Sequence, residues 1–335
     1  GLVSLAALQA VTSFLRCVIL FLFAKWRGPN FQLGFGFIRK KTSLELLSFG
    51  IFAFIADVGT QLVFYTDSLV IGIFIGSAAI AFYNIGLMLV EHGRNLLKQF
   101  RNVITPDLLK SGGRSNLSET QWLMIKSIRF FMLLAIPLFV GFMTLGKEFI
   151  SLWMGPEYDQ SATILFILAL AQFATTSSSP CAITLMGLNR IKFLAAMSIL
   201  NGILNLSLSV LFVVVFNLGI TGVALGTLIP MILINGIGVP IYACRALELK
   251  VFDLLRLTFF RWFPTVVFFA VPCIAMARLP FSLSWFTFFA KVIVLGAIYV
   301  PIAFPILLTS QDRAALLEHI RDALNFRPRK ASKAT

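Results

Sequence analysis

The chain has 335 residues, of which 59% are hydrophobic and only 13% are charged, and its mean hydropathy is +0.92. A soluble fold of this length could not bury that much apolar surface, so the composition excludes a cytosolic enzyme, a secreted domain and a disordered chain. Lysine and arginine number 28 against 14 acids. In a membrane protein such a surplus marks cytoplasmic loops, so it does not indicate a nucleic-acid partner.

The apolar residues form continuous runs of about twenty, not the short alternating segments of a β-barrel, which predicts membrane-spanning helices. The nine predicted spans cover residues 2–24, 46–65, 80–97, 128–145, 162–185, 193–216, 220–243, 259–277 and 285–308. Residues 251–262 are expected to form a helix at the membrane interface, and residues 310–325 an amphipathic helix on the cytoplasmic surface. The sequence therefore predicts an all-α polytopic membrane protein.

The basic residues predict the orientation of these spans. Of the 28 basic residues, 24 lie around the connections that follow the first, third, fifth, seventh and ninth spans. Because basic loops stay in the cytoplasm, we expect the C-terminus, Lys40, Lys110, Arg190 and Lys250 to lie inside and Glu157 to lie outside.

Motifs of soluble catalysis are absent from the sequence. There is no P-loop, no HExxH motif and no GxSxG motif. The two histidines have no clustered ligands beside them, and the four cysteines form no CxxC pair. We therefore expect a protein that is not an enzyme and that has neither a metal site nor a cofactor.

Polar residues inside the predicted spans are candidates for the lining of a substrate cavity. Such residues are costly at bilayer depth and usually face a bundle interior or a wet cavity, and here they recur at helical spacing on one face of a span. The candidates are Gln9, Ser13, Arg16, Gln61, Gln172, Asn201 and Asn205. Hydrogen bonding between helices is the simpler explanation for the Ser, Thr and Asn residues.

Charged residues inside the spans carry more information. Arg16 and Asp57 both lie deep in apolar segments, where packing alone requires no charge, and this favours a functional role. Asp57 is a candidate for binding a proton or a sodium ion, or for balancing Arg16. Glu91, near a cytoplasmic helix end, is a second coupling candidate. Lys291 lies close to the start of the last span, and we expect its amine to extend outward to the membrane surface.

Several motifs resemble those of one transporter superfamily. The stretch 66–83, TDSLVIGIFIGSAAIAFY, carries Asp67, Gly72, Gly76 and Tyr83. Four further motifs follow it: Thr105-Pro106, GPEY at 155–158, MGLNRIK at 186–192 and NLGITGVALG at 217–226. Their order and spacing resemble the multidrug/oligosaccharidyl-lipid/polysaccharide (MOP) flippase superfamily, and within it the polysaccharide-biosynthesis flippases. The resemblance covers about residues 44–243.

The resemblance implies a MATE-like fold of two six-helix lobes followed by two extra helices. It divides the chain into the last N-lobe helix with a cytoplasmic inter-lobe linker (1–43), a six-helix C-lobe (44–243), an interfacial helix with two additional membrane helices (244–308) and a basic cytoplasmic tail (309–335). It also implies that five N-lobe helices precede this chain, so a site built across both lobes would be only half present.

The resemblance further implies a flippase of a bacterial or archaeal inner membrane. Its cargo would be undecaprenyl-pyrophosphate-linked oligosaccharide, moved to the outer leaflet by alternating access for the biosynthesis of cell-surface polysaccharide. Arg16 would bind the pyrophosphate, because its planar fork pairs with phosphate oxygens. Asp57 or Glu91 would couple transport to protons or sodium ions, and polysaccharide assembly proteins would be partners.

Two other functions compete with this one. The first is a cation-coupled multidrug or small-molecule antiporter of the same superfamily, which would need a cavity richer in carboxylates than Asp57 and Glu91 provide. The second, more distant, is a membrane-embedded polysaccharide polymerase or glycosyltransferase. That class usually needs a sizeable outer loop or a metal-binding cluster of carboxylates, and the sequence indicates neither.

Overall fold

A computed structural model describes residues 2–27, 40–113, 116–279 and 283–307, and every regular element in these ranges is a helix. The chain divides into two units, Gly1–Ile51 and Phe52–Thr335. The predicted amphipathic helix 310–325 and the basic tail 309–335 lie outside the described residues.

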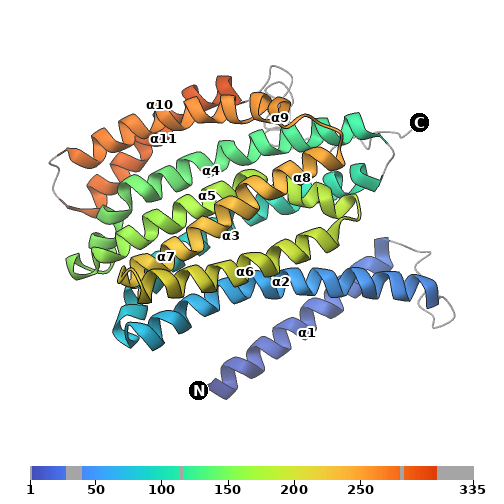
Figure 1. Cartoon of the computed structure of the whole chain (residues 1–335), viewed down its shortest axis with the longest axis horizontal. Coiled ribbons are helices and arrows are strands. Elements are labelled where there is room, and N and C mark those ends of the chain that lie inside the picture. Colours follow the sequence, from blue (N-terminus) through green and yellow to red (C-terminus); the bar gives the residue numbers. More distant parts are fainter. Residues whose placement is uncertain (1, 28–39, 114–115, 280–282, 308–335) are drawn as a thin grey trace. The chain divides into compact units, whose positions relative to one another are not determined.

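Every predicted span overlaps a helical segment of the structure (Figure 1). In chain order they are α1 (Leu2–Arg27), α2 (Lys40–Phe74), α3 (Ser77–Gly113), α4 (Leu117–Trp153), η2 (Pro156–Tyr158), α5 (Gln160–Gly187), α6 (Ile191–Val214), α7 (Gly219–Pro230), η3 (Met231–Gly238), α8 (Val239–Ala246), α9 (Val251–Leu257), α10 (Phe259–Arg278) and α11 (Trp285–Leu307). Each of the nine predicted spans coincides with a helix or, for residues 220–243, with the continuous α7–η3–α8 segment.

Within the described ranges, eight helical segments are long and apolar enough to cross a membrane. The helix α3, which contains the predicted span 80–97, is not among them. Charged residues, among them Glu91, Arg94, Lys98 and Arg101, occupy its middle and make it more polar than the neighbouring helices. The prediction of an all-helical, multi-pass membrane protein is confirmed.

The helices α2, α3 and α4 are longer than their predicted spans. They contain 35, 37 and 37 residues. At about 1.5 Å per residue each is some 50–55 Å long, well beyond a hydrocarbon core of about 30 Å. The predicted second span ended at Tyr65, but α2 continues to Phe74, so Thr66, Asp67 and Ser68 lie inside a helix.

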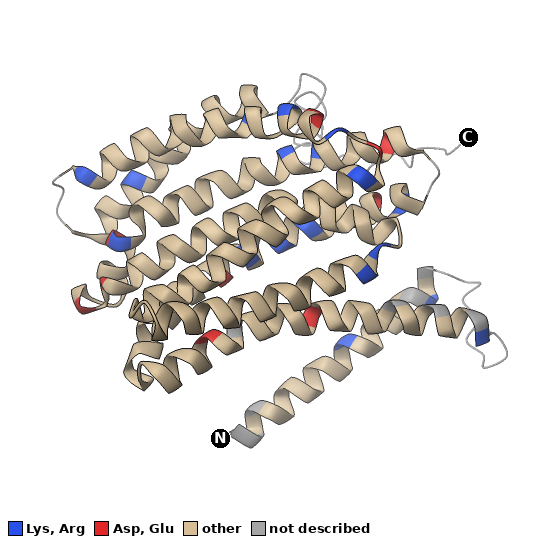
Figure 2. Ribbon diagram, in the orientation of Figure 1, with Lys and Arg blue, Asp and Glu red and all other residues tan. Residues whose placement is uncertain are grey.

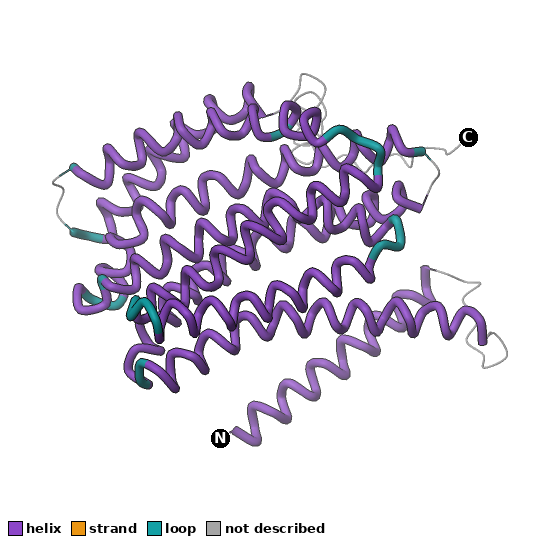
Figure 3. The backbone as a smooth tube through the Cα atoms, viewed as in Figure 1, coloured by secondary structure: helices purple, strands orange, loops and turns teal. Residues whose placement is uncertain are grey.

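Short connections join the helices of the Phe52–Thr335 unit (Figure 3). Only Ile75 and Gly76 separate α2 from α3, and both of their backbone N–H groups donate to the carbonyl of Ile71 at 2.9 Å. In this unit successive connections alternate between the two ends of the helices, as the distribution of basic residues predicted (Figures 1 and 2). Figure 2 shows most of the charged residues of the unit towards the helix ends.

The core of this unit is the packing of α3 and α4 against α5. Its largest fully buried side chains include Tyr83, Phe131 and Phe139. Close approach of α3 to α5 depends on Gly86, where an added Cβ would lie only 2.8 Å from the backbone nitrogen of Leu165. Small residues at crossings of this kind let membrane helices gain van der Waals contact without a hydrophobic driving force.

Two features interrupt the regular helices of the second half. Pro230 ends α7, and the π-helical segment η3 follows it directly. A second break, at Thr258, separates the seven-residue helix α9 from α10. The Arg129 side chain on α4 donates to the carbonyl of Leu257 at 3.0 Å, which fixes the end of α9. The segment predicted as one interfacial helix over 251–262 is therefore a short helix followed by the start of α10.

Candidate functional site

A fully buried polar cluster surrounds the carboxylate of Asp67 on α2, and Asp67 is 0% exposed. The Tyr83 hydroxyl, on α3, donates to Oδ2 at 2.6 Å, and the Thr227 hydroxyl, on α7, donates to the same oxygen at 2.8 Å. The Asn205 side-chain amide, on α6, donates to Oδ1 at 3.2 Å. Residues from four helices therefore meet at one carboxylate, which we call the Asp67 cluster.

A second layer of contacts holds these groups in place. The Asn205 amide nitrogen also lies 2.8 Å from the Thr227 hydroxyl oxygen, and the Thr66 hydroxyl donates to Asn205 Oδ1 at 3.2 Å. The helices α6 and α7 cross closely because Gly226 has no side chain: an added Cβ would lie 2.6 Å from the backbone nitrogen of Ser209. This crossing brings Asn205 and Thr227 within reach of each other.

The Asp67 carboxylate has no basic partner in the described part of the chain. The ion pairs formed there include Glu91–Arg94, Lys147–Asp159 and Glu148–Lys291, none of which involves Asp67. Burying a carboxylate costs several kcal/mol unless its oxygens accept hydrogen bonds, and here the neutral donors Tyr83, Thr227 and Asn205 satisfy them. Among the described residues, hydrogen bonds alone hold the Asp67 carboxylate, and a bound proton or cation would stabilise it further.

Asn201 extends the cluster by one helical turn. It lies four residues before Asn205 on α6 and is 6% exposed, and its Oδ1 has no hydrogen-bond partner among the described residues. One carboxylate together with amide and hydroxyl oxygens is a donor set that suits a hard cation or a proton. The described ranges contain no group of three or more His, Cys, Asp or Glu that could hold a metal ion.

The cluster lies within the helices, away from their ends. Asp67 is seven residues before the end of α2, which is about 10 Å along the helix axis. Thr227 lies three residues before Pro230, where α7 gives way to the π-helical segment η3. Short π-helical segments are often found at functional sites.

Among the predicted cavity residues of the Phe52–Thr335 unit, Asn205 belongs to the Asp67 cluster, and Asn201 lies one turn away on the same helix. Gln61 is exposed on α2, and Gln172 is half-buried on α5. On α3, Asn84 and Asn95 are exposed as well. Lipid solvates exposed amide side chains poorly, so these positions stay candidates for the lining of a wet cavity.

The predicted coupling residues Asp57 and Glu91 lie apart from the Asp67 cluster. Asp57 is exposed on α2, and Arg101 on α3 lies within electrostatic range of both Asp57 and Arg94. Glu91 pairs with Arg94 at 3.2 Å, one turn further along the same helix, with both side chains about a third or more exposed. Glu91 is thus one member of an ordinary surface pair.

Gln9, Ser13 and Arg16 lie on α1, where all three are exposed. They belong to the unit Gly1–Ile51, whereas Asp57 belongs to the unit Phe52–Thr335. The pairing of Arg16 with Asp57, and the binding of pyrophosphate by Arg16, therefore stay predictions.

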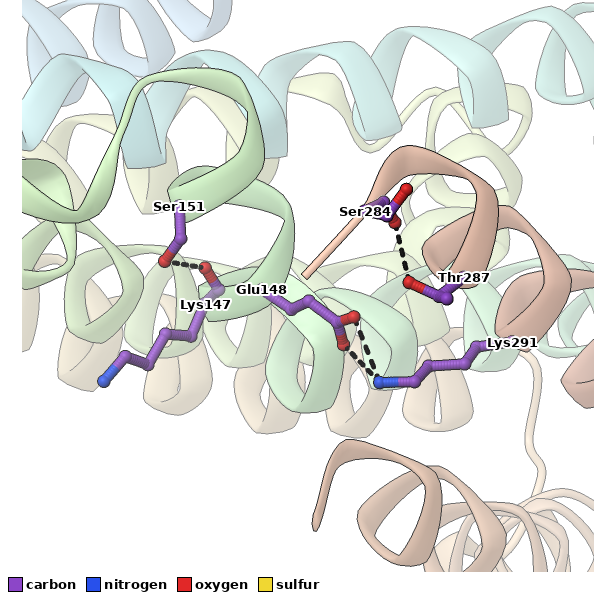
Figure 4. A network of polar contacts seen from close by, with 6 residues as sticks. All are labelled: Lys147, Glu148, Ser151, Ser284, Thr287 and Lys291. Atoms are coloured by element: carbon purple, nitrogen blue, oxygen red, sulfur yellow. Dashed lines mark hydrogen bonds and ion pairs between the residues drawn. The ribbon is translucent and has the colours of Figure 1, made fainter. Parts of the chain in front are cut away.

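The expectation for Lys291 was wrong. We expected its amine to extend outward to the membrane surface, but the side chain is only 6% exposed. Its Nζ contacts both carboxylate oxygens of Glu148 on α4, at 3.0 and 2.9 Å (Figure 4). A carboxylate within reach inside the bundle compensates the ammonium directly, so the long side chain has no need to reach the surface.

Sequence reasoning missed Asp67 as a site residue because the predicted second span stopped two residues before it. Asp67 entered the sequence analysis only as part of the motif at residues 66–83. The signal that could have found it is the largely apolar run that follows, Leu69–Phe74, through which α2 continues despite Gly72. A carboxylate between two apolar stretches of one helix is a functional candidate by the same reasoning that selected Asp57.

Comparison with known proteins adds two matches. Residues 1–163 match the model of a family described as polysaccharide biosynthesis protein. Over 322 residues the chain is 25% identical to a protein of Bacillus subtilis (strain 168) named uncharacterized membrane protein EpsK, an alignment that covers 95% of this chain. The chain spans 63% of the length of that relative. No solved structure matches the chain significantly. The predicted resemblance to polysaccharide-biosynthesis proteins is confirmed.

Proposed function

We propose that the chain works as a flippase, because its residues 1–163 match the polysaccharide biosynthesis protein family and its helices form a multi-pass membrane bundle. Its cargo is an undecaprenyl-pyrophosphate-linked oligosaccharide, which it carries from the inner to the outer leaflet of a bacterial inner membrane for the assembly of cell-surface polysaccharide. Transport proceeds by alternating access in a MATE-like fold, with residues 44–243 as the C-lobe that rocks against an N-lobe.

The observation that carries this proposal is the Asp67 cluster. A transporter can use a buried carboxylate of this kind to bind a proton or sodium ion in one conformation and to release it in the other. Asp67 is therefore the coupling residue in our proposal, with the Asn205 amide and the Thr227 hydroxyl hydrogen-bonded to its carboxylate. Asp57 is no longer the first candidate.

The exposed amides of α2 and α3 support a cavity for a hydrophilic cargo. Gln61, Asn84 and Asn95 can each donate and accept hydrogen bonds, as sugar hydroxyls do. In the proposal these residues face the oligosaccharide, and Arg16 on α1 binds the pyrophosphate through its bidentate fork. The polyprenyl chain stays in the bilayer.

The decisive experiment replaces Asp67 by Asn in cells that make the protein from its own gene. The substitution keeps the shape and some hydrogen bonds of the side chain but removes its charge. We expect normal amounts of protein in the membrane, surface polysaccharide reduced to the level of cells lacking the gene, and lipid-linked oligosaccharide accumulating on the inner leaflet. Asp57→Asn, on the same helix but exposed, is the matched variant and should retain surface polysaccharide.

Each alternative gives a different result. Lipid-linked single repeats that accumulate on the outer leaflet of cells lacking the gene would indicate a polymerase. Normal polysaccharide together with lost drug efflux would indicate the antiporter. If Asp57→Asn abolishes surface polysaccharide and Asp67→Asn does not, coupling takes place at Asp57.

A further inference from the structure

A buried ion pair joins helix α11 to helix α4. Glu148, near the end of α4, and Lys291, in the second turn of α11, form two contacts of 3.0 and 2.9 Å between Nζ and the two carboxylate oxygens (Figure 4). The Lys291 and Glu148 side chains are 6% and 14% exposed, respectively. The charges of Glu148 and Lys291, which are 143 residues apart in sequence, therefore compensate each other across two helices.

Aromatic rings pack next to the ion pair. Phe149, the residue after Glu148, contacts the rings of Trp285 and Phe288 on α11, with centroids 5.8 and 5.6 Å away. A low-dielectric surrounding strengthens the attraction between the two charges and also raises the cost of leaving either one alone.

Lys147 and Glu148 are adjacent on α4 but differ in their exposure to solvent. Lys147 is 68% exposed and pairs with Asp159 at 3.1 Å, beside the start of α5. Figure 4 shows the Lys147 and Glu148 side chains pointing in opposite directions from adjacent positions. The Lys147 pair is a surface pair of little energetic weight, whereas Glu148 faces the interior.

The described buried residues of α11 are mainly apolar, and one of them makes a further polar contact with α4. The buried residues of α11 recur every three or four positions and form one stripe: Phe288, Lys291, Leu295, Tyr299, Ala303 and Leu307. The Tyr299 hydroxyl donates to the carbonyl of Leu133 on α4 at 2.8 Å. Lys291 is the one charged member of this stripe, so the packing of α11 requires that its charge be balanced.

We propose that the Glu148–Lys291 pair is a lock that fixes α11 to α4. The ionised carboxylate of Glu148 stabilises the ammonium of Lys291 inside the α11 stripe. With the pair formed, α11 is a fixed part of the bundle and moves with α4. This inference does not depend on what the protein transports.

The test combines three variants of the full-length protein: Glu148→Gln, Lys291→Met and the double variant. Each single change removes the ion pair and leaves one of its two charges without the opposite charge, so we expect the midpoint of thermal unfolding in detergent to fall by roughly 5–10 °C. The double variant removes both charges and should recover most of that loss. Lys147→Met, which removes the exposed neighbouring charge, is the matched control and should leave the midpoint unchanged.

A second readout follows the docking of α11 directly and keeps the test informative if a variant folds poorly. In a Cys17→Ser background, Leu295→Cys places a thiol at a position that is 3% exposed, and Ile293→Cys places one at a position that is 71% exposed. We expect N-ethylmaleimide to label position 295 at least several-fold faster in Glu148→Gln than in the parent, with labelling at 293 unchanged and position 295 protected again in the double variant. The proposal is wrong if both single variants keep the unfolding midpoint and the labelling rate of the parent. It is also wrong if the double variant unfolds at a lower temperature than either single variant.

Discussion

The hydrogen bond from Tyr83 to Asp67 is the shortest contact in the buried cluster. Both residues are 0% exposed, and the oxygens are 2.6 Å apart. A charge-assisted hydrogen bond of this kind is about twice as strong as a neutral one. At the scale of single residues, Tyr83 therefore contributes both to the stability of the bundle and to the state of Asp67.

Tyr83→Phe should destabilise the protein by about 1–3 kcal/mol, because it removes a donor and leaves a buried carboxylate oxygen less well satisfied. Thermal unfolding in detergent measures the change. Tyr158→Phe is the control, since the ring of that half-buried tyrosine packs on Phe82 with centroids 5.3 Å apart and has no role at Asp67. Equal midpoints for Tyr83→Phe and the parent would show that the Asp67–Tyr83 contact adds no stability.

At the scale of helices, the crossing of α3 and α5 determines where Tyr83 lies. Gly86 follows Tyr83 by less than one turn on α3, and an added Cβ there would lie 2.8 Å from Leu165 N and 3.1 Å from Ser161 O. Both neighbours are backbone atoms, which cannot move aside as a flexible side chain could. The helices must therefore separate to accept even one methyl group.

Gly86→Ala should cost about 1–3 kcal/mol through overpacking, despite the higher helix propensity of alanine. The matched control is Gly141→Ala on α4, where an added Cβ would meet no heavy atom within 4 Å among the described residues. That variant should be neutral or more stable by about 0.5–1 kcal/mol. Unfolding midpoints of the two variants, measured side by side, check the argument, and a stable Gly86→Ala protein would refute it.

At the scale of the whole molecule, the alternation of basic and non-basic connections predicts which ends of the helices face the cytoplasm. Cysteine introduced at Glu157, in the loop after α4, should react with a membrane-impermeant maleimide added to intact cells. Cysteine introduced at Lys110, near the end of α3, should react only after the cells are permeabilised. Cys17→Ser removes the one exposed cysteine among the described residues and lowers the background. Labelling of position 110 but not of position 157 in intact cells would show that the orientation is opposite to the predicted one.

The sequence alone determined that this is a multi-pass helical membrane protein, where its helices lie and to which family it is similar. Hydropathy, helical spacing and motif order are properties of neighbouring residues, so they can be read before any tertiary contact is known. For the same reason the sequence selected Asn201 and Asn205, which lie one turn apart on the mainly apolar helix α6.

Only the tertiary structure showed which polar residues meet. The predicted second span ended before Asp67, whereas α2 continues past it. Three other helices then bring Tyr83, Asn205 and Thr227 to its carboxylate. Lys291 looked like a residue that reaches the surface until Glu148 was found beside it. In both cases the free energy of a buried charge depends on groups contributed by distant parts of the chain, and no local pattern records which helix will supply them.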